Sequence, residues 1–176
     1  MSKKKIITIV GLMGAGKTTI GSRLAQILKY YFIDSDQEIE DSEHRSIADI
    51  FAQNGEKYFR EIEAKTIQEI VNRDEEMVLS LGGGAFINQE TRKILKQKTL
   101  IIWLHASIEE TLKRINSKSN RPLLNQKNKR QVLEELAKIR YPIYREADFD
   151  FDTTHLTHED LVEKIINNIQ NFKNVQ

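Results

Sequence analysis

Short apolar runs alternate along the chain with longer stretches in which apolar residues recur every three or four positions. The short runs are rich in β-branched and aromatic residues, as buried strands are, whereas the longer stretches have the period of amphipathic helices. We expect strands at 5–10, 30–34, 77–81, 100–104 and 149–152. We expect helices at 16–29, within 36–54, and at 57–73, 88–96, 107–115, 131–147 and 157–171. This alternation predicts an α/β fold of three layers, α/β/α, in which helices cover both faces of a five-stranded parallel sheet.

Polar residues mark the points where several of these helices begin or end. Ser46, Asn88 and Ser107 each precede a helical stretch and are good N-caps, because their side chains can accept a hydrogen bond from a free backbone N–H. Gly55 is placed to end the helix before it. Pro142 lies inside the stretch 131–147, and we expect it to strain or bend that helix.

The segment 116–130 has no apolar period. It reads NSKSNRPLLNQKNKR, is polar and basic, and contains one of the two prolines in the chain. We interpret it as a mobile excursion from the fold rather than as a linker between domains. The 176 residues contain no internal repeat, and we expect them to form a single domain.

The charge and cysteine content exclude several classes of function. Lys and Arg total 27 against 26 for Asp and Glu, a net charge of +1, so no global field attracts nucleic acid or an anionic membrane. The chain has no cysteine, which excludes disulfides, thiolate zinc sites and cysteine nucleophiles. The basic N-terminus precedes an apolar run, Ile6 to Val10, that is too short for a signal peptide or a membrane span. We expect a cytoplasmic protein.

Three of the eight glycines lie in the stretch GLMGAGKT at 11–18. This stretch matches the pattern G-x-x-x-x-G-K-[ST] at every fixed position and lies between an expected strand and an expected helix, which is the context in which the pattern binds phosphate. Glycine lets consecutive backbone N–H groups face an anion, and the helix N-terminus adds its positive end. Lys17 would reach the β- and γ-phosphates, and the Thr18 hydroxyl would be a ligand of Mg²⁺. We therefore expect a site for a nucleoside triphosphate rather than a glycine-rich turn with a solvated lysine.

Asp34 and Asp36 stand where the second expected strand ends. Residues two apart on an extended chain share a face, so both carboxylates can point into the crevice at the carboxyl edge of the sheet, where open α/β sheets bind ligands. One carboxylate would serve magnesium and the other a hydroxyl acceptor. The same pattern also occurs where an acidic residue only caps a helix.

Four further features have both a functional and an ordinary interpretation. Arg60 stands one helical turn from Glu63, which is typical of a surface ion pair. The glycines at 82–84 follow a buried strand, where bare backbone lets a ligand approach, although a plain turn has the same composition. Arg121, in the run RPLL, and Arg140, in R-x-x-x-Y, would otherwise be solvated residues. The combination is more specific, because the acids and glycines lie at strand ends and helices can carry the arginines to the same crevice.

With these features together, the chain resembles the shikimate kinases. The resemblance runs from GLMGAGKT through DSD, FREIE, GGG and RPLL to RYPIY, so it covers nearly the whole chain. It implies a P-loop kinase fold with a substrate-binding segment at about 36–73 and a lid at about 116–130. It also implies ATP as co-substrate, Mg²⁺ as cofactor, shikimate as the phosphate acceptor and a place in aromatic amino acid biosynthesis. We expect a monomer that binds neither nucleic acid nor a membrane.

The resemblance assigns roles to individual residues. Asp34 would serve the metal together with Thr18, and Asp36 would hold acceptor hydroxyls and is the candidate base. Arg60 and Arg140 would grip the shikimate carboxylate, because guanidinium groups pair bidentately with carboxylates. The implied catalytic residues are Lys17, Asp36 and Arg121. The implied nucleotide-binding residues are Gly11, Gly14, Ala15, Gly16, Lys17, Thr18, Thr19, Arg114 and Arg121. The implied acceptor-binding residues are Asp36, Phe51, Phe59, Arg60, Gly82, Gly83, Gly84 and Arg140.

Some of these positions have a more specific role in the family that the chain resembles. There the middle glycine of the triplet, Gly83 in this chain, offers its backbone N–H to the substrate. Phe51 and Phe59 match an apolar wall beside the shikimate ring, and Arg114 matches a residue that stacks on adenine. The chain departs from the pattern at His155, where some relatives carry an arginine near the adenine. The base contacts at that point therefore stay open.

Two other interpretations stay open as well. Another small P-loop kinase, acting on gluconate or a nucleoside monophosphate, would share the glycine loop, and gluconate would also require arginines. A regulatory P-loop protein would have no acceptor site, and the set of Asp36, Arg60 and Arg140 argues against it. We interpret the histidines as incidental, because no convincing metal-ligand spacing joins His44, His105, His155 and His158.

Overall fold

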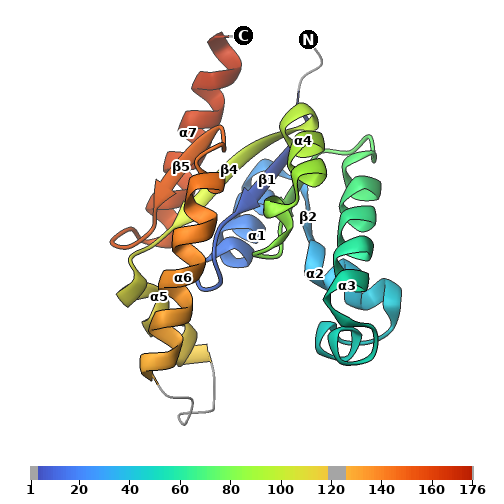
Figure 1. Cartoon of the computed structure of the whole chain (residues 1–176). Helices are drawn as coiled ribbons and strands as arrows, with labels where there is room; N and C mark the ends of the chain where they lie inside the picture. Colours follow the sequence, from blue (N-terminus) through green and yellow to red (C-terminus); the bar gives the residue numbers. More distant parts are fainter. Residues whose placement is uncertain (1–3, 119–125, 176) are drawn as a thin grey trace.

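A computed structural model of the protein describes residues 4–118 and 126–175 (Figure 1). Its centre is a five-stranded sheet in the order β2-β3-β1-β4-β5, and every pair of neighbouring strands is parallel. The strands are β1 (Ile6–Val10), β2 (Tyr31–Asp34), β3 (Met77–Ser80), β4 (Thr99–His105) and β5 (Phe149–Asp152). The prediction of a five-stranded parallel sheet is therefore confirmed, with each strand end within about one residue of its expected place.

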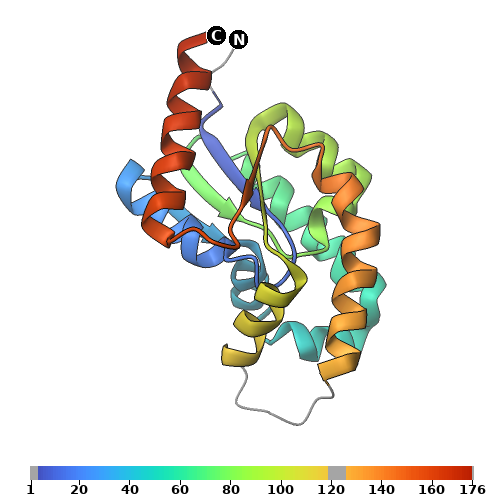
Figure 2. The ribbon, with the colours of Figure 1, turned by 90° about the vertical axis from the view of Figure 1, so that its left-hand side faces the viewer.

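Helices cover both faces of this sheet, with α6 on one side and α7 on the other in Figure 2. They are α1 (Lys17–Leu28), α2 (Ser35–Glu43), α3 (Ile47–Val71), α4 (Gln89–Lys98), α5 (Ile108–Lys118), α6 (Gln126–Tyr144) and α7 (His158–Val175), with a 3-10 turn η1 (Ala85–Ile87). Residues of α3, α4 and α6 share one apolar cluster with the sheet, and residues of α1 and α7 share the other. The three-layer prediction is confirmed. None of the helices in the described ranges has the length and apolar composition needed to span a membrane.

The central strand β1 is buried on both faces because both layers pack against it. Its side chains alternate, so Ile7 and Ile9 contact the cluster formed with α1 and α7, while Ile6 and Val10 contact the opposite cluster. Strands with two covered faces have continuous apolar sequences, as this one does. The apolar run therefore places β1 in the middle of the fold and its carboxyl end at the middle of one sheet edge.

The three predicted N-caps are confirmed, and Gly55 interrupts the helical stretch before it as predicted. The side chains of Ser46, Asn88 and Ser107 each accept a hydrogen bond from the backbone N–H three residues on, at 3.1, 3.0 and 3.2 Å. Gly55 lies within the range of α3 but has φ 80° and ψ 175°, which is not helical, so two helical stretches meet there at a kink. Only glycine adopts such a φ readily, and the stretch before Gly55 ends there as expected.

The helices on either side of residues 119–125 are longer than the sequence indicated. α5 continues to Lys118 and α6 begins at Gln126, so the prediction of an irregular segment over the whole of 116–130 is wrong at both ends. Lys, Gln and Arg are good helix formers and need no apolar period to continue a helix. Residues 119–125, with Arg121 and the centre of the expected lid, lie outside the described residues.

Candidate active site

The carboxyl ends of β1, β3 and β2, which are neighbours in the sheet, bring three chain segments together. These segments are the glycine loop at 11–16, the acidic pair at 34–36 and the glycine triplet at 82–84. Parallel strands direct all their carboxyl ends to one edge of the sheet, so segments far apart in the sequence become neighbours there. The expectation that the acids and the glycines share one edge is confirmed.

The glycine loop leads directly into the N-terminus of α1. Gly16 precedes the helix with φ 91°, a left-handed conformation that glycine adopts without strain. Gly11 lies so close to the backbone carbonyl of Leu104 that no Cβ would fit. The loop therefore requires glycine at both points. The free N–H groups at the start of α1 and the positive end of that helix make the loop a site for an anion.

Lys17 is the first residue of α1, and its ammonium group lies across the loop. Its Nζ donates a hydrogen bond to the carbonyl oxygen of Leu12 at 3.1 Å. Burial lowers the pKa of Lys17, the carboxylates of Asp36 and Asp34 raise it, and Arg140 lowers it. The ammonium therefore lies within electrostatic reach of both acids and of one expected acceptor arginine.

Thr18 and Asp34 place two oxygen atoms side by side. Oγ1 of Thr18 donates to Oδ2 of Asp34 at 2.9 Å, which joins the start of α1 to the end of β2. The second oxygen, Oδ1, accepts a hydrogen bond from the N–H of Asp36 at 3.1 Å and caps α2. The capping interpretation of Asp34 is therefore correct for one oxygen, and the other faces Thr18. Hydroxyl and carboxylate oxygens are the ligands that Mg²⁺ prefers, so this pair fits that cation.

Asp36 stands in the first turn of α2 with its carboxylate against Gly82. A Cβ on Gly82 would collide with the carboxylate oxygens. Burial raises the pKa of Asp36, and the Asp34 carboxylate raises it further, whereas Lys17 lowers it. A carboxylate whose pKa is raised in this way is a better proton acceptor for a hydroxyl than one in water.

The other two glycines of the triplet each contact an arginine. A Cβ on Gly84 would lie 2.7 and 2.8 Å from the terminal nitrogens of Arg60, and a Cβ on Gly83 would lie 3.1 Å from Nη1 of Arg140. The bare backbone therefore lets side chains from α3 and α6 approach the same short segment. The structure brings the acid and the two arginines to the same glycine triplet, as the combined pattern in the sequence predicted.

All three carbonyl groups of the triplet accept hydrogen bonds, whereas some of its backbone N–H groups have no acceptor. The carbonyls of Gly82 and Gly84 accept from the N–H groups three residues on, at 3.1 and 3.0 Å. The carbonyl of Gly83 accepts from Nη1 of Arg140 at 2.7 Å and from the hydroxyl of Tyr144. Among the described residues, the N–H groups of Gly83 and Gly84 have no hydrogen-bond acceptor. Two backbone donors beside two guanidinium groups make this segment suitable for binding a carboxylate.

Arg60 is held by a buried carboxylate. Its Nη1 lies 2.8 Å from Oε2 of Glu63, whose side chain is 4% exposed, and its Nη2 lies 3.4 Å from Oε1 of Glu56. The predicted one-turn spacing is present, but the interpretation as a surface ion pair is wrong because Glu63 is buried. Burial raises the pKa of Glu63, and the Arg60 guanidinium lowers it. The sequence analysis missed Glu63 as part of the site, although an acid one turn after the arginine was the available signal.

Phe51 and Phe59 lie together beside Arg60. Their ring centroids are 4.7 Å apart, with Phe59 buried and Phe51 at 37% exposure. The guanidinium carbon of Arg60 lies 5.1 Å from the centroid of the Phe59 ring. The two aromatic rings therefore form an apolar surface next to the arginine, as the expected acceptor wall requires.

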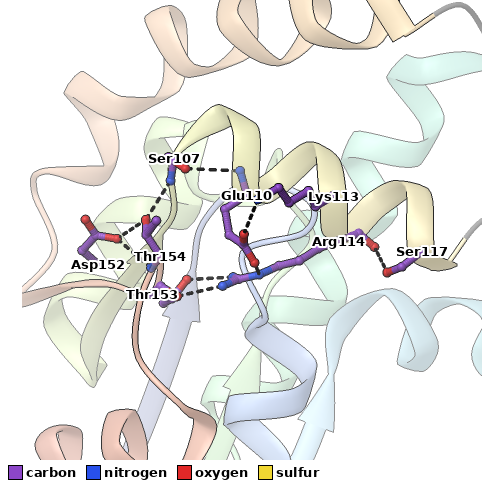
Figure 3. A network of polar contacts seen from close by, with 8 residues as sticks. All are labelled: Ser107, Glu110, Lys113, Arg114, Ser117, Asp152, Thr153 and Thr154. Atoms are coloured by element: carbon purple, nitrogen blue, oxygen red, sulfur yellow. Dashed lines mark hydrogen bonds and ion pairs between the residues drawn. The ribbon is translucent and has the colours of Figure 1, made fainter.

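Arg114 belongs to a separate polar network between α5 and the segment that follows β5 (Figure 3). Its Nε donates to Oε1 of Glu110 at 3.0 Å, while Nη1 and Nη2 donate to the hydroxyl and carbonyl oxygens of Thr153 at 2.9 and 2.7 Å. Each nitrogen of the guanidinium therefore has a protein partner, which fixes its plane. His155, two residues beyond Thr153, is exposed.

The fold and this cluster of residues define a P-loop kinase: a phosphate-binding loop lies between a central parallel strand and a helix, at the same sheet edge as a glycine triplet that contacts an acid and two arginines. The family model described as shikimate kinase matches residues 13–170 of the chain. The chain belongs to the shikimate kinase family.

The similarity to individual members of the family extends over most of the length of both compared chains. The chain is 44% identical to shikimate kinase of Zymomonas mobilis over 162 residues, which are 92% of this chain and 92% of that protein. It superposes with a TM-score of 0.87 and 41% identity on shikimate kinase from Acinetobacter baumannii in complex with shikimate, covering 96% and 94% of the two chains. A gluconokinase from Sinorhizobium meliloti, with a TM-score of 0.61, 16% identity and 96% and 94% coverage, shares the fold alone.

Proposed function

We propose that the protein transfers the γ-phosphate of ATP to the 3-hydroxyl of shikimate, which gives shikimate 3-phosphate and ADP in the route to the aromatic amino acids. Membership of the family supports this proposal. The structural observation that carries it is the glycine triplet, on which Asp36, Arg140 and Arg60 pack in turn, beside the loop lysine. This arrangement suits a small acceptor that has both hydroxyl groups and a carboxylate.

The acceptor half of the crevice supplies complementary groups for each part of shikimate. Arg60 and Arg140 would pair with its carboxylate, and the free N–H of Gly83 would donate to the same molecule. Phe51 and Phe59 would cover the apolar side of the ring. Arg60 is already held by Glu63 and Glu56, so little of its side-chain freedom is lost when the acceptor binds.

Asp36 is the group proposed to act on the acceptor hydroxyl. Its carboxylate would accept a hydrogen bond from the 3-hydroxyl and orient the oxygen for attack on the γ-phosphorus. The raised pKa of Asp36, caused mainly by burial, favours proton acceptance as the oxygen–phosphorus bond forms. Lys17, which lies near Asp36, would stabilise the negative charge that develops on the transferred phosphoryl group.

The donor half consists of the glycine loop and the Arg114 network. Gly11, Gly14, Ala15, Gly16, Lys17, Thr18 and Thr19 would bind the triphosphate, and the fixed plane of Arg114 would stack on the adenine. Thr18 and Asp34 would hold Mg²⁺, which neutralises phosphate charge when it is bound. The proposal also retains the sequence-based expectation of a cytoplasmic monomer.

The test is a coupled assay of ADP release with MgATP and a panel of acceptors. Shikimate should raise ADP release strongly, whereas gluconate and nucleoside monophosphates should not. A larger response to gluconate or to a nucleotide would favour the alternative kinase, and no response to any acceptor would favour a regulatory protein.

A further inference from the structure

The hydroxyl of Tyr144 occupies a position that the proposed chemistry does not use. Tyr144 is the last residue of α6, one turn after Arg140, and its side chain is buried. Its hydroxyl donates to the carbonyl oxygen of Gly83, and Nη1 of Arg140 donates to the same oxygen at 2.7 Å. A carbonyl oxygen has two lone pairs, so these two donors together saturate it.

Packing explains why an aromatic ring stands at Tyr144, but it does not explain why the ring carries a hydroxyl group. Its centroid lies 6.1 Å from that of Trp103 and 6.2 Å from that of Phe86, so a phenylalanine would fill the same space. Burial raises the pKa of Tyr144 to about 12, and the group therefore stays a hydrogen-bond donor over the working pH range. A buried hydroxyl requires a partner, and here it donates to the Gly83 carbonyl beside the Arg140 guanidinium.

Arg140 has two competing acceptors once an acidic substrate is present. In the structure its Nη1 is bonded to the Gly83 carbonyl, whereas a bound carboxylate would attract the same guanidinium. If Arg140 turned to the substrate without a second donor on Gly83, a partly buried carbonyl would be left unpaired, which is unfavourable. The hydroxyl of Tyr144 supplies that second donor.

We infer that Tyr144 is a positioning residue for the acidic acceptor: it holds the Gly83 carbonyl so that Arg140 is released to the substrate carboxylate and the Gly83 N–H keeps its direction. This inference rests on the proposed function. It predicts an effect on the affinity for the acceptor that depends on the acceptor's carboxylate. Tyr144 itself would not touch the substrate.

The experiment compares Tyr144→Phe with the wild-type enzyme and with the matched control Tyr141→Phe, on the same helix. Tyr144→Phe should raise the KM and Kd for shikimate by about 3- to 10-fold, which is the range expected for loss of one hydrogen bond. The KM for ATP at saturating shikimate should stay within about twofold, and so should kcat. Tyr141→Phe should leave all four constants unchanged, because its hydroxyl is not bonded to the glycine triplet.

A second measurement separates positioning from stability. Binding of an analogue in which a hydroxymethyl group replaces the carboxylate should be equally weak in wild type and Tyr144→Phe, because it cannot draw Arg140 from Gly83. This comparison uses the same folded sample, so a lower Tm alone does not change it. An unchanged shikimate KM, or an equal loss for shikimate and the neutral analogue, would overturn the inference. Failure of the wild-type enzyme to use shikimate would instead overturn the proposed function.

Discussion

The carboxylate of Glu63 lies 2.8 Å from the guanidinium of Arg60 and is almost fully buried. The orientation of the arginine is therefore set by a charge that solvent does not reach. Glu63→Gln keeps the shape of the side chain and removes the charge. Binding of shikimate should weaken by about 1–2 kcal/mol, because Arg60 is then held less firmly. ATP binding should not change. Titration calorimetry with each ligand measures both.

Glu69 on the same helix provides the control for Glu63. Its carboxylate lies 3.9 Å from Lys65, and both side chains are exposed, so this pair contributes little. Glu69→Gln should leave shikimate affinity unchanged. Equal behaviour of the two variants would contradict the proposed role of the buried pair.

Substitution of either acceptor arginine should weaken the binding of shikimate much more than the binding of ATP. Arg60→Ala and Arg140→Ala should each weaken shikimate binding by about 2–5 kcal/mol, because each removes one side of a desolvated charge pair. The affinity for ATP should change much less. Arg23→Ala, which removes an exposed pair with Glu159 on the surface between α1 and α7, is the control. Unchanged shikimate affinity in either acceptor variant would return that arginine to a solvated role.

The space beside Gly84 gives a prediction that does not involve a charged substitution. Gly84 has φ −102° and ψ −18°, which alanine adopts readily, so Gly84→Ala introduces no backbone strain. Its Cβ would lie 2.7 Å from a nitrogen of Arg60 and should displace that guanidinium. We expect a higher KM for shikimate and an unchanged KM for ATP. In the background Arg60→Ala the same change should have no further effect, and an additive loss would contradict the mechanism.

Asp36→Asn should slow turnover strongly and stabilise the ligand-free protein. Because burial and Asp34 raise the pKa of Asp36 above its ordinary value, the ionised form is less favourable in the folded chain than in the unfolded chain. This loss of stability is present at neutral pH and disappears as the pH falls through the folded pKa. We therefore expect a Tm a few degrees higher at neutral pH and a smaller difference in acid.

Differential scanning fluorimetry over a pH series measures that difference directly. Asp41→Asn, an exposed position on the same helix, serves as the control and should shift the Tm little. kcat of Asp36→Asn should fall by about 10²- to 10⁴-fold if the carboxylate acts as a base. A Tm difference that grows on acidification would contradict the assigned direction of the pKa shift.

Substitution of Thr153 should change the KM for the nucleotide and not the KM for the acceptor. Its hydroxyl and carbonyl both hold Arg114, so Thr153→Val removes one of the two contacts and leaves the shape intact. The KM for ATP should rise about 2- to 10-fold, with no change in the KM for shikimate. Thr153→Ser keeps the hydroxyl and should restore the wild-type value. If valine and serine behave alike, the hydroxyl does not position Arg114.

The features that the sequence predicted well are those determined locally. Lys17 and Thr18 belong to a short sequence pattern, so neighbouring residues in the chain determine their positions. The position of strand β1 is likewise determined by one apolar run. The caps at Ser46, Asn88 and Ser107 likewise depend on four consecutive residues. Local physics decides these features, so a single sequence is sufficient for them.

The features that the sequence missed depend on tertiary placement. The burial of Glu63 depends on what packs over its face of α3, and the bond from Tyr144 to Gly83 joins residues 61 apart. The start of α6 at Gln126 was missed because a polar helix turn has no apolar period.

The small apolar cluster of Ile39, Ile50 and Phe59 joins α2 to α3 apart from the two clusters that hold the sheet. Figure 1 shows α2 and the start of α3 together at one end of the molecule. A unit with so few buried contacts opens at a lower free energy than the whole protein unfolds, so its amide hydrogens should exchange while those of the sheet stay protected. Asp36 and Arg60 are carried by this unit, whereas Lys17 is anchored to the sheet. Part of the binding free energy of the acceptor is therefore spent on ordering the unit that carries Asp36 and Arg60. The nucleotide, in contrast, binds to a loop that the sheet already holds in place.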